Sequence, residues 1–262
     1  MKTNYHTHTE RCKHAYGSEE EFILAAIEGG IEELGFADHT PWPFKTKDFE
    51  PRMRMKLSQF QDYLDTCTAL KEKYKDQISI KIGLECEYYE EYIDWLEHIA
   101  KNKVNYLIFG NHYAYSDDIY PIAPYMGNCV KDPVSLQAYV ESSLKGIRSG
   151  LFSYFAHPDL FMRCYPQIDE HVLQAAHTLC KACADEKLPL EINLSAVAVL
   201  MRNPYSLYPC RPFYEIAKSY GCSVIIGYDA HTPDPLKDRQ LYEFACKWID
   251  EIGLHRIEKL CI

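Results

Sequence analysis

The sequence lacks long apolar segments. It contains no run of about 18 uncharged apolar residues that would cross a membrane, and its first residues, Met-Lys-Thr-Asn-Tyr-His-Thr-His, include no stretch of signal-peptide length. We therefore expect a soluble cytoplasmic protein with no membrane partner. The eleven cysteines are odd in number and irregularly spaced, so without an export signal we expect reduced thiols.

Positive charge is also scarce, with 28 Lys and Arg against 38 Asp and Glu and a formal net charge of −10. Because proteins that bind long nucleic acids neutralise many phosphates with Lys and Arg, we expect no nucleic-acid partner. A small phosphate ester needs only a few local cations or metal ions. A glycine-rich phosphate loop of the GxxxxGK[ST] kind is absent, which excludes that type of phosphate site.

The chain of 262 residues is long enough for one large α/β barrel or two small domains. No Gly/Ser-rich linker, low-complexity tract or fixed-period repeat divides it, so we expect a single domain over residues 1–262. Strand-like apolar runs alternate with helix-like stretches, a pattern typical of parallel β/α units. About seven strands are expected, near residues 3–8, 33–37, 78–85, 104–109, 151–156, 188–194 and 223–228.

Local signals mark a helix boundary and two irregular segments. Ser18, three residues before Glu21, predicts a capped helix start, and Gly29-Gly30 predicts the end of that helix. Residues 40–51 and 113–133 are too irregular for simple connections, and both follow an expected strand. Because active sites of α/β barrels gather at the C-terminal ends of the strands, we expect these segments to shape a pocket.

The histidines are distributed unevenly along the chain. Seven of the eleven lie in or just after an expected strand, and these are His6, His8, His14, His39, His112, His157 and His231. The other four fall in helix-like segments among charged residues, and we interpret them as surface or packing residues: His98, His171, His177 and His255.

Strand geometry favours a metal site for the first group. Side chains alternate between the two faces of a strand, so His6 and His8 share one face. This spacing suits two ligands of one ion, although two buried core histidines would show it as well. The ends of four other expected strands carry ionisable side chains, namely Asp38-His39, His112, His157 with Asp159, and Asp229-Ala-His231. Four independent strand ends of this kind favour ligands over core residues.

A carboxylate also belongs to this pattern. In the strand near residues 78–85, the apolar side chains alternate onto one face and Glu85 falls on the other, where it can reach the barrel mouth. There it can bridge two cations, which neutral imidazole cannot do, and Asp229 can act similarly from the last strand. Glu87 shares the face of Glu85 and is a competing candidate.

The number of candidate ligands indicates several ions. Seven imidazoles and two carboxylates are too many for one four-coordinate ion, so two or three divalent metals fit better, with zinc, manganese and iron all compatible. Adjacent cations lower the pKa of a bridging water and bind phosphate oxygens, which suits hydrolysis of a phosphate ester. Arg163 and Arg202, just beyond the fifth and sixth strands, are candidate phosphate contacts, although surface arginines would occur there equally often.

The sequence resembles the PHP (polymerase and histidinol phosphatase) superfamily, and within it the histidinol-phosphatase branch. The matching motifs span residues 6 to 231 and are His6-Thr-His8, Cys12-Lys-His14-Ala, Asp38-His39, Glu85, Gly110-Asn-His112, Ala156-His157-Pro-Asp159 and Asp229-Ala-His231. The resemblance implies a distorted, TIM-like (β/α)7 barrel with three metal ions. It also implies hydrolysis of the small phosphomonoester L-histidinol phosphate to L-histidinol and phosphate, a late step of histidine biosynthesis.

The resemblance further implies a role for each site residue. His6, His8, Glu85 and Asp229 would hold the first metal, Glu85, His112 and His157 the second, and His14, His39 and His231 the third, with Arg163 and Arg202 as phosphate contacts. A hydroxide bridging the first two metals is expected to attack phosphorus. Asp159 and Asp38 are the candidate general acids, although Asp159 can instead orient His157.

Other functions fit parts of this pattern. A metal-dependent amidohydrolase also begins with H-x-H on a barrel strand, but it does not need the ligands of a third metal. A PHP-type phosphodiesterase or nuclease is chemically closer, but the acidic charge balance disfavours a long polyanionic substrate. A non-enzymatic metal-binding protein would be expected to lack part of the ligand set, which is complete here. The sequence does not indicate an oligomeric state.

Overall fold

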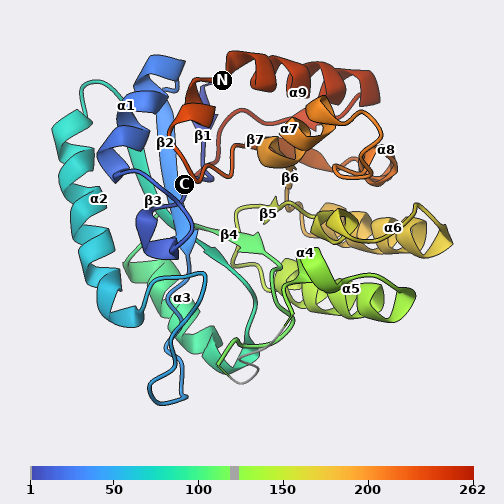
Figure 1. Ribbon diagram of the computed structural model, residues 1–262, viewed down its shortest axis with the longest axis horizontal. Helices are drawn as coiled ribbons and strands as arrows, with labels where there is room; N and C mark the ends of the chain where they lie inside the picture. Colours follow the sequence, from blue (N-terminus) through green and yellow to red (C-terminus); the bar gives the residue numbers. More distant parts are fainter. Residues whose placement is uncertain (1, 119–123) are drawn as a thin grey trace.

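A computed structural model describes residues 2–118 and 124–262 of the chain (Figure 1). Within these ranges, eight strands form one sheet in the order β1-β2-β3-β4-β5-β6-β7-β8, and each neighbouring pair is parallel. The strands are β1 (Thr3–Asn4), β2 (Glu33–His39), β3 (Ser79–Cys86), β4 (Tyr106–Gly110), β5 (Phe155–Ala156), β6 (Leu190–Asn193), β7 (Ser223–Gly227) and β8 (His255–Arg256).

Helices connect successive strands and lie around the outside of the sheet (Figure 1). They are α1 (Glu19–Gly29), α2 (Phe60–Tyr74), α3 (Ile93–Asn102), α4 (Met126–Cys129), α5 (Pro133–Arg148), α6 (Glu170–Asp185), α7 (Leu194–Arg202), α8 (Arg211–Ser219) and α9 (Arg239–Ile252). Among the described residues, no helix combines the length and apolar character needed to span a membrane.

The boundaries of α1 follow from its sequence. The Ser18 hydroxyl accepts the backbone N–H of Glu21, and the Glu21 carboxylate accepts the backbone N–H of Ser18 at 2.7 Å. At the other end, Gly30 has a φ of 77°, a conformation that glycine adopts without steric cost. The predicted start and end of this helix are therefore confirmed.

The sheet curls into a barrel, so that β1 at its first edge approaches β7 and β8 at its other edge. Beyond β1, Thr7 forms a parallel bridge with Ala230, which lies beyond β7. The N–H of His8 donates to the carbonyl of Ala230 at 2.9 Å, and the N–H of Ala230 donates to the carbonyl of His6 at 3.1 Å. At the N-terminal ends of the strands, β8 pairs with β7, and the hydroxyl of Thr3 in β1 donates to the carbonyl of Glu258, just after β8. The expected TIM-like α/β barrel is confirmed.

Tyr106 fills the barrel interior below the strand ends. Its hydroxyl donates to the carbonyls of Tyr5 and Phe36, at 2.8 and 3.0 Å. The ring takes the space next to Gly83, where a Cβ atom would lie 2.5 Å from two of its carbons. A large aromatic side chain thus joins strands that are far apart in the sequence and supports the rim above it.

Some expected elements differ from those observed. β8 adds an eighth strand, and it contains His255, which the sequence had placed in a helix-like segment. The strand expected at 151–156 contains only Phe155–Ala156. Residues 40–51 form neither helix nor strand, as expected. The irregular stretch 113–133 contains the short helix α4, and its residues 119–123 lie outside the described ranges.

Candidate metal centre

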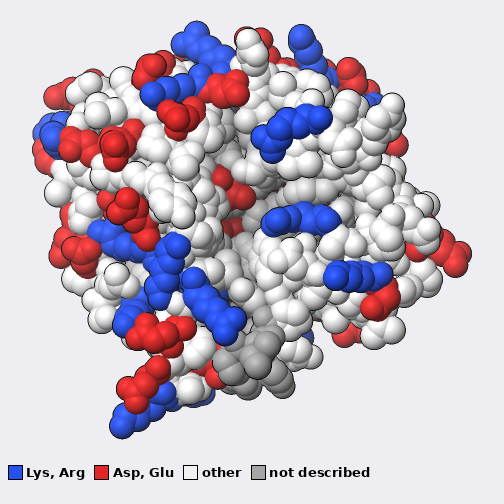
Figure 2. Space-filling model, in the orientation of Figure 1, with Lys and Arg blue, Asp and Glu red and all other residues white. Residues whose placement is uncertain are grey.

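A pocket of about 920 Å³ opens at the C-terminal ends of the strands. The space-filling view shows a hollow with acidic side chains at its floor and cationic side chains beside its rim (Figure 2). Seven of the nine predicted ligands line this pocket, namely His14, His39, Glu85, His112, His157, Asp229 and His231. His6 and His8 are fully buried beneath them.

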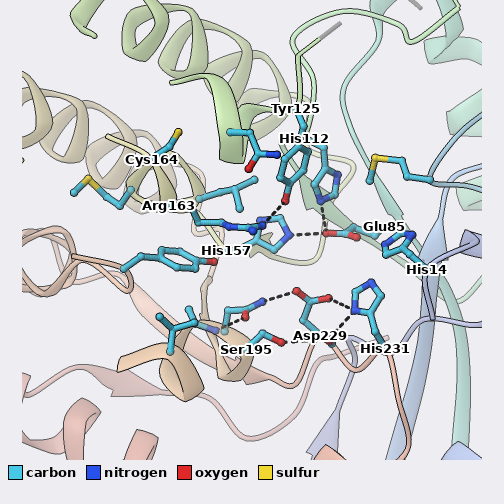
Figure 3. Close-up of a pocket in the computed structure, with 18 of the residues that line it drawn as sticks. His14, Glu85, His112, Tyr125, His157, Arg163, Cys164, Ser195, Asp229 and His231 are labelled. Carbon is cyan, nitrogen blue, oxygen red and sulfur yellow. Dashed lines mark hydrogen bonds and ion pairs between the residues drawn. The ribbon is translucent and has the colours of Figure 1, made fainter. Parts of the chain in front are cut away.

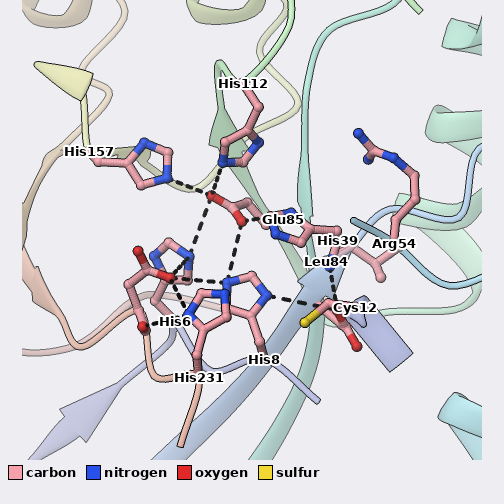
Figure 4. Close-up of polar contacts among 12 residues, drawn as sticks. His6, His8, Cys12, His39, Arg54, Leu84, Glu85, His112, His157 and His231 are labelled. Carbon is pink, nitrogen blue, oxygen red and sulfur yellow. Dashed lines mark hydrogen bonds and ion pairs between the residues drawn. The ribbon is translucent and has the colours of Figure 1, made fainter. Parts of the chain in front are cut away.

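Glu85 lies at the centre of the cluster, near the end of β3, and is 1% exposed. Its carboxylate is within 3.5 Å of five imidazoles, which Figure 4 shows converging on it, and Figure 3 shows two of them, His112 and His157, from the pocket side. Measured from a Glu85 oxygen, the distances are 2.8 Å to His157 Nε2, 3.1 Å to His39 Nδ1, 3.3 Å to His112 Nε2, 3.4 Å to His6 Nε2 and 3.5 Å to His8 Nε2. The Glu85 carboxylate is thus surrounded by imidazole nitrogens that come from several strand ends.

Asp229 provides a second carboxylate from the end of β7. Its Oδ1 lies 3.2 Å from His8 Nε2, 3.4 Å from His231 Nδ1 and 3.5 Å from His6 Nε2. Asp229 has a φ of 51° and His157 a φ of 32°. Left-handed backbone is unfavourable for such residues and gathers at functional sites. These strand ends therefore hold their side chains in place at a cost in backbone energy.

His14, His39 and His231 complete the cluster on its other side. The ring centroids of His14 and His231 are 4.7 Å apart, and those of His14 and His39 are 5.3 Å apart. The Nδ1 atoms of His14 and His231 contact the carbonyls of Cys12 and Asp229, at 2.8 and 3.0 Å. A ring that donates its Nδ1–H to a carbonyl leaves Nε2 free as an electron-pair donor.

Cys12 is a neighbour of the cluster that the ligand count from the sequence left out. Its sulfur and the ring nitrogens of His14 and His231 lie within 4.8 Å of one another. The motif Cys12-Lys-His14 was visible in the sequence, but a single cysteine carries no strand-face pattern that would mark it as part of the site.

A third carboxylate, Glu191, contacts His6 from the side of the ring away from Glu85. Glu191, at the centre of β6, is fully buried, and its Oε1 lies 2.7 Å from His6 Nδ1. Its Oε2 accepts the backbone N–H of His157 at 2.9 Å and the side-chain amide of Asn193 at 3.0 Å. Glu191 therefore turns His6 Nε2 toward Glu85 and Asp229. No pattern in the sequence marks this role, because Glu191 lies in an ordinary strand position.

Gly227 leaves room for the Glu191 carboxylate, and replacing it with alanine is expected to weaken metal binding. A Cβ at Gly227 would lie 2.0 Å from Glu191 Oε1, so Gly227→Ala pushes the carboxylate away from His6. We expect a loss of about 1–3 kcal/mol in stability and roughly tenfold to hundredfold weaker zinc binding, measured by thermal unfolding and competition with a chelator.

Gly221→Ala is the matched control for this substitution. Gly221 has a φ of 72° and open space around it, so alanine there introduces backbone strain away from the cluster. It should lower stability while leaving zinc affinity unchanged. Equal zinc affinities for the two variants would contradict the role assigned to Glu191.

Charges in the cluster are strongly coupled. Burial lowers the pKa of an imidazole, but nearby carboxylates outweigh it at His6, whose pKa is raised well above its usual value, and at His8 and His112, whose pKa rises to about 9. Burial and the neighbouring charge of His8 lower the pKa of His231 to about 4. Although burial raises the pKa of Glu85, the surrounding imidazoles hold it well below its usual value.

The donor set fits divalent metal ions. Seven buried atoms of the candidate ligands form no hydrogen bond of acceptable geometry among the described residues, although several lie within 3.5 Å of another candidate ligand. They are His6 Nε2, His8 Nδ1 and Nε2, His39 Nδ1, His157 Nδ1, His231 Nε2 and Glu85 Oε2. An unpaired buried polar atom costs about 1–3 kcal/mol, so gathering several in one place is unfavourable without a ligand. Triads with donor atoms within 4.8 Å include His6, His8 and Glu85, and His8, His39 and His231. Such nitrogen and carboxylate sets suit zinc and similar ions.

The two candidate acids are buried and do not line the pocket. Asp38 is fully buried and accepts hydrogen bonds from the Thr9 hydroxyl and, at 2.7 Å, from the N–H of His39. Asp159 accepts the N–H of Cys210 at 2.6 Å and the hydroxyl of Tyr214 at 3.2 Å, and burial raises its pKa to about 6. Neither residue is among those that line the pocket.

The two candidate arginines lie in different places. Arg163 lines the pocket, and its guanidinium donates to the Tyr125 hydroxyl at 3.3 Å (Figure 3). Arg202 is exposed at the end of α7 and is not among the pocket-lining residues. Because α7 begins directly after β6, Arg202 is carried a full helix length from the strand end. Arg52, which the sequence did not single out, lines the pocket instead.

Comparisons with known proteins show which family and which folded structures the chain is similar to. The sequence matches the PHP domain over residues 4–195. A probable histidinol-phosphatase of Deinococcus radiodurans is 28% identical, with 95% of this chain and 92% of the relative covered. The histidinol-phosphatase of Bacillus subtilis is 25% identical, with 88% and 94% covered. The structure of histidinol phosphate phosphatase from Lactococcus lactis, complexed with zinc, L-histidinol and phosphate, aligns with a TM-score of 0.74 and 21% identity over 99% of this chain and 96% of that one.

The fold and the cluster define a TIM-like α/β barrel built around a candidate metal centre at its C-terminal rim. Because the matched residues 4–195 make up most of the sequence, the chain belongs to the PHP domain family.

Proposed function

We propose that this protein is a metal-dependent phosphomonoesterase that hydrolyses L-histidinol phosphate to L-histidinol and phosphate. The observation that carries the proposal is the convergence of seven imidazoles, Glu85 and Asp229 at the floor of one pocket. Membership of the PHP family and the names of the relatives from D. radiodurans and B. subtilis support the choice of substrate.

The metal ligands are proposed as three sets, of which the first two share Glu85. His6, His8, Glu85 and Asp229 would hold one ion, Glu85, His112 and His157 a second, and His14, His39 and His231 a third. When bound, divalent cations neutralise phosphate oxygens and lower the pKa of water to near neutrality. Zinc is the first ion to test, because the L. lactis structure is described with zinc.

The pocket walls supply groups that suit a small phosphate ester. Arg163 presents a guanidinium whose fixed fork of donors matches phosphate oxygens, and the hydrogen bond to Tyr125 holds it at the rim. Arg52 is a second cation on the lining. The ring of Tyr125 lies nearly parallel to that of His112, with centroids 5.9 Å apart. A flat ring of this kind can stack against the imidazole of the substrate.

The whole chain is proposed to form one PHP-type phosphatase domain over residues 1–262. The sheet continues from β6 through β7 to β8 beyond the matched residues 4–195, and Asp229 and His231 join the cluster from that part. A cytoplasmic location belongs to the same proposal, since the enzyme would act on an intermediate of amino-acid biosynthesis.

A substrate panel tests the function directly. Zinc-loaded protein is incubated with phosphomonoesters that include histidinol phosphate, with a phosphodiester and with amide substrates, and phosphate and ammonia are measured. Metal content is determined on the same samples. We expect phosphate release, with kcat/KM for histidinol phosphate at least about tenfold above the other monoesters, a difference of about 1.4 kcal/mol in transition-state binding.

Each alternative predicts a different result from this panel. Ammonia release without phosphate would identify an amidohydrolase. Preferred cleavage of the phosphodiester would identify a phosphodiesterase. Phosphate release from monoesters without preference for histidinol phosphate would retain the metallophosphatase and refute the assignment to histidine biosynthesis.

A further inference from the structure

A fully buried arginine lies next to the metal cluster without being part of it. Arg54, from the irregular segment between β2 and α2, is 0% exposed. It donates to both oxygens of Glu87 at 3.0 Å, to Asp117 Oδ2 at 2.9 Å and to the carbonyl of Thr40 at 3.3 Å. Figure 4 shows Arg54 to one side of the imidazoles. Taking a guanidinium out of water is costly unless such partners are in place.

Glu87 links this arginine to a metal ligand. Its Oε1 lies 3.0 Å from Nδ1 of His112, and its Oε2 accepts the indole N–H of Trp42 at 3.1 Å. His112 Nε2 therefore points to Glu85, at 3.3 Å. From the sequence, Glu87 is a competing candidate for the metal-binding role of Glu85. In the structure the two carboxylates contact different nitrogens of the His112 ring, Glu87 at Nδ1 and Glu85 at Nε2.

Asp117 links the same arginine to the pocket wall. It belongs to the segment that follows β4 and accepts the Tyr89 hydroxyl at 3.2 Å. Next to it, Asp118 accepts the backbone N–H groups of Lys45 and Thr46 at 2.9 and 3.0 Å. The two irregular segments after β2 and β4 are thus joined through buried carboxylates.

These two segments also carry residues that line the pocket. Arg52 lies two residues before Arg54, and Tyr113 directly follows His112; both line the pocket. The guanidinium of Arg54 is therefore linked through Glu87 to His112, a proposed metal ligand. Through Asp117 it is linked to the segment after β4 that forms part of the pocket wall.

We infer that Arg54 is a positioning residue that acts in two directions, holding His112 through Glu87 and the wall that bears Arg52 through Asp117. The inference rests on the metal cluster of the proposed function, but not on the identity of the substrate. Carboxylates that orient ligating imidazoles change metal affinity by about tenfold to a hundredfold when altered.

The two directions are separable by substitution. Glu87→Gln is expected to weaken zinc binding tenfold to a hundredfold, measured by competition with a chromophoric chelator. Asp117→Asn leaves Glu87 and His112 in place, so zinc affinity should stay within about twofold while KM for the best phosphomonoester of the panel rises severalfold. Arg54→Met should both weaken zinc binding and raise KM. Arg54→Lys keeps the positive charge but loses the forked donor geometry of the guanidinium, so it should restore part of the zinc affinity and part of the KM.

The control is Arg256→Met, at β8. Arg256 is partly buried and pairs with Glu258 at 2.8 Å, away from the cluster, so its loss should change neither zinc affinity nor KM. If Arg54→Met does not fold, Arg54→Lys and the two carboxylate variants still carry the test. Variants of Arg54 that lower the unfolding temperature but keep zinc affinity and KM unchanged would overturn the inference and leave a purely structural ion pair.

Discussion

Replacing Glu85 with glutamine is expected to lower kcat by about a thousandfold or more and to reduce the zinc content of the purified protein. Glu85 contacts five imidazoles and is 1% exposed. Glutamine keeps the shape but removes the charge, and its amide nitrogen has no lone pair to give a metal. The loss of a shared ligand removes several kcal/mol of transition-state stabilisation, and each 1.36 kcal/mol is a tenfold change in rate. Single-turnover rates and metal analysis measure both effects.

Glu85→Asp is the matched control for this substitution. It keeps the charge on a side chain one methylene shorter, so zinc content and turnover should fall between those of the native protein and the glutamine variant. A glutamine variant with full zinc content and full turnover would refute the central place given to Glu85.

Removing the metal ions with a chelator is expected to abolish turnover and to lower the unfolding temperature, by several degrees more at pH 9 than at pH 6.5. The pKa of His8 and of His112 is raised to about 9 in the polypeptide alone. These rings have a pKa of 6.5 in the unfolded chain, so below pH 6.5 their protonated form contributes its full stabilisation to the metal-free fold. This contribution is lost as the pH rises through about 9, the pKa of the rings in the folded protein. With metal bound, the ligating rings are already deprotonated. Thermal scans of loaded and stripped protein measure the difference.

Other titrating groups do not reverse this trend. The pKa of His231 is about 4 and that of His39 is well below its usual value, so both rings are neutral over this range. Glu85 and Asp229, whose pKa values are held well below the usual range, stay charged. Returning zinc should restore turnover and the higher unfolding temperature. A difference between loaded and stripped protein that shrinks as the pH rises would contradict the assignment of protonated His8 and His112.

The strand-end pattern of the sequence anticipated much of this arrangement. Parallel strands bring their carboxyl ends to one rim, so histidines far apart in the chain could be expected together from alternation and position alone. The structure places His39, His112 and His157 around Glu85 in this way. The assignment of each ligand to a particular ion remains a prediction.

Other features had no periodic signal to reveal them. Arg54 lies in an irregular segment, where neither its burial nor its partners follow from neighbouring residues. Glu191 occupies an inward strand position that looks like any other until its contact with His6 is known. Arg202 was placed near the pocket because it follows a strand, but α7 starts without a loop and carries it away. Such positions depend on packing between distant segments rather than on local pattern.

The bridge between Thr7 and Ala230 joins two parts of the site that are synthesised at different times. During synthesis, which runs from the N-terminus to the C-terminus, His6 and His8 are made long before Asp229 and His231. His6 and His8 therefore meet their partners only after the segment that follows β7 has been made. A metal ion bound by His8 and Asp229 would join these two distant segments of the chain. We expect full metal loading to follow completion of the chain rather than to guide its first steps of folding.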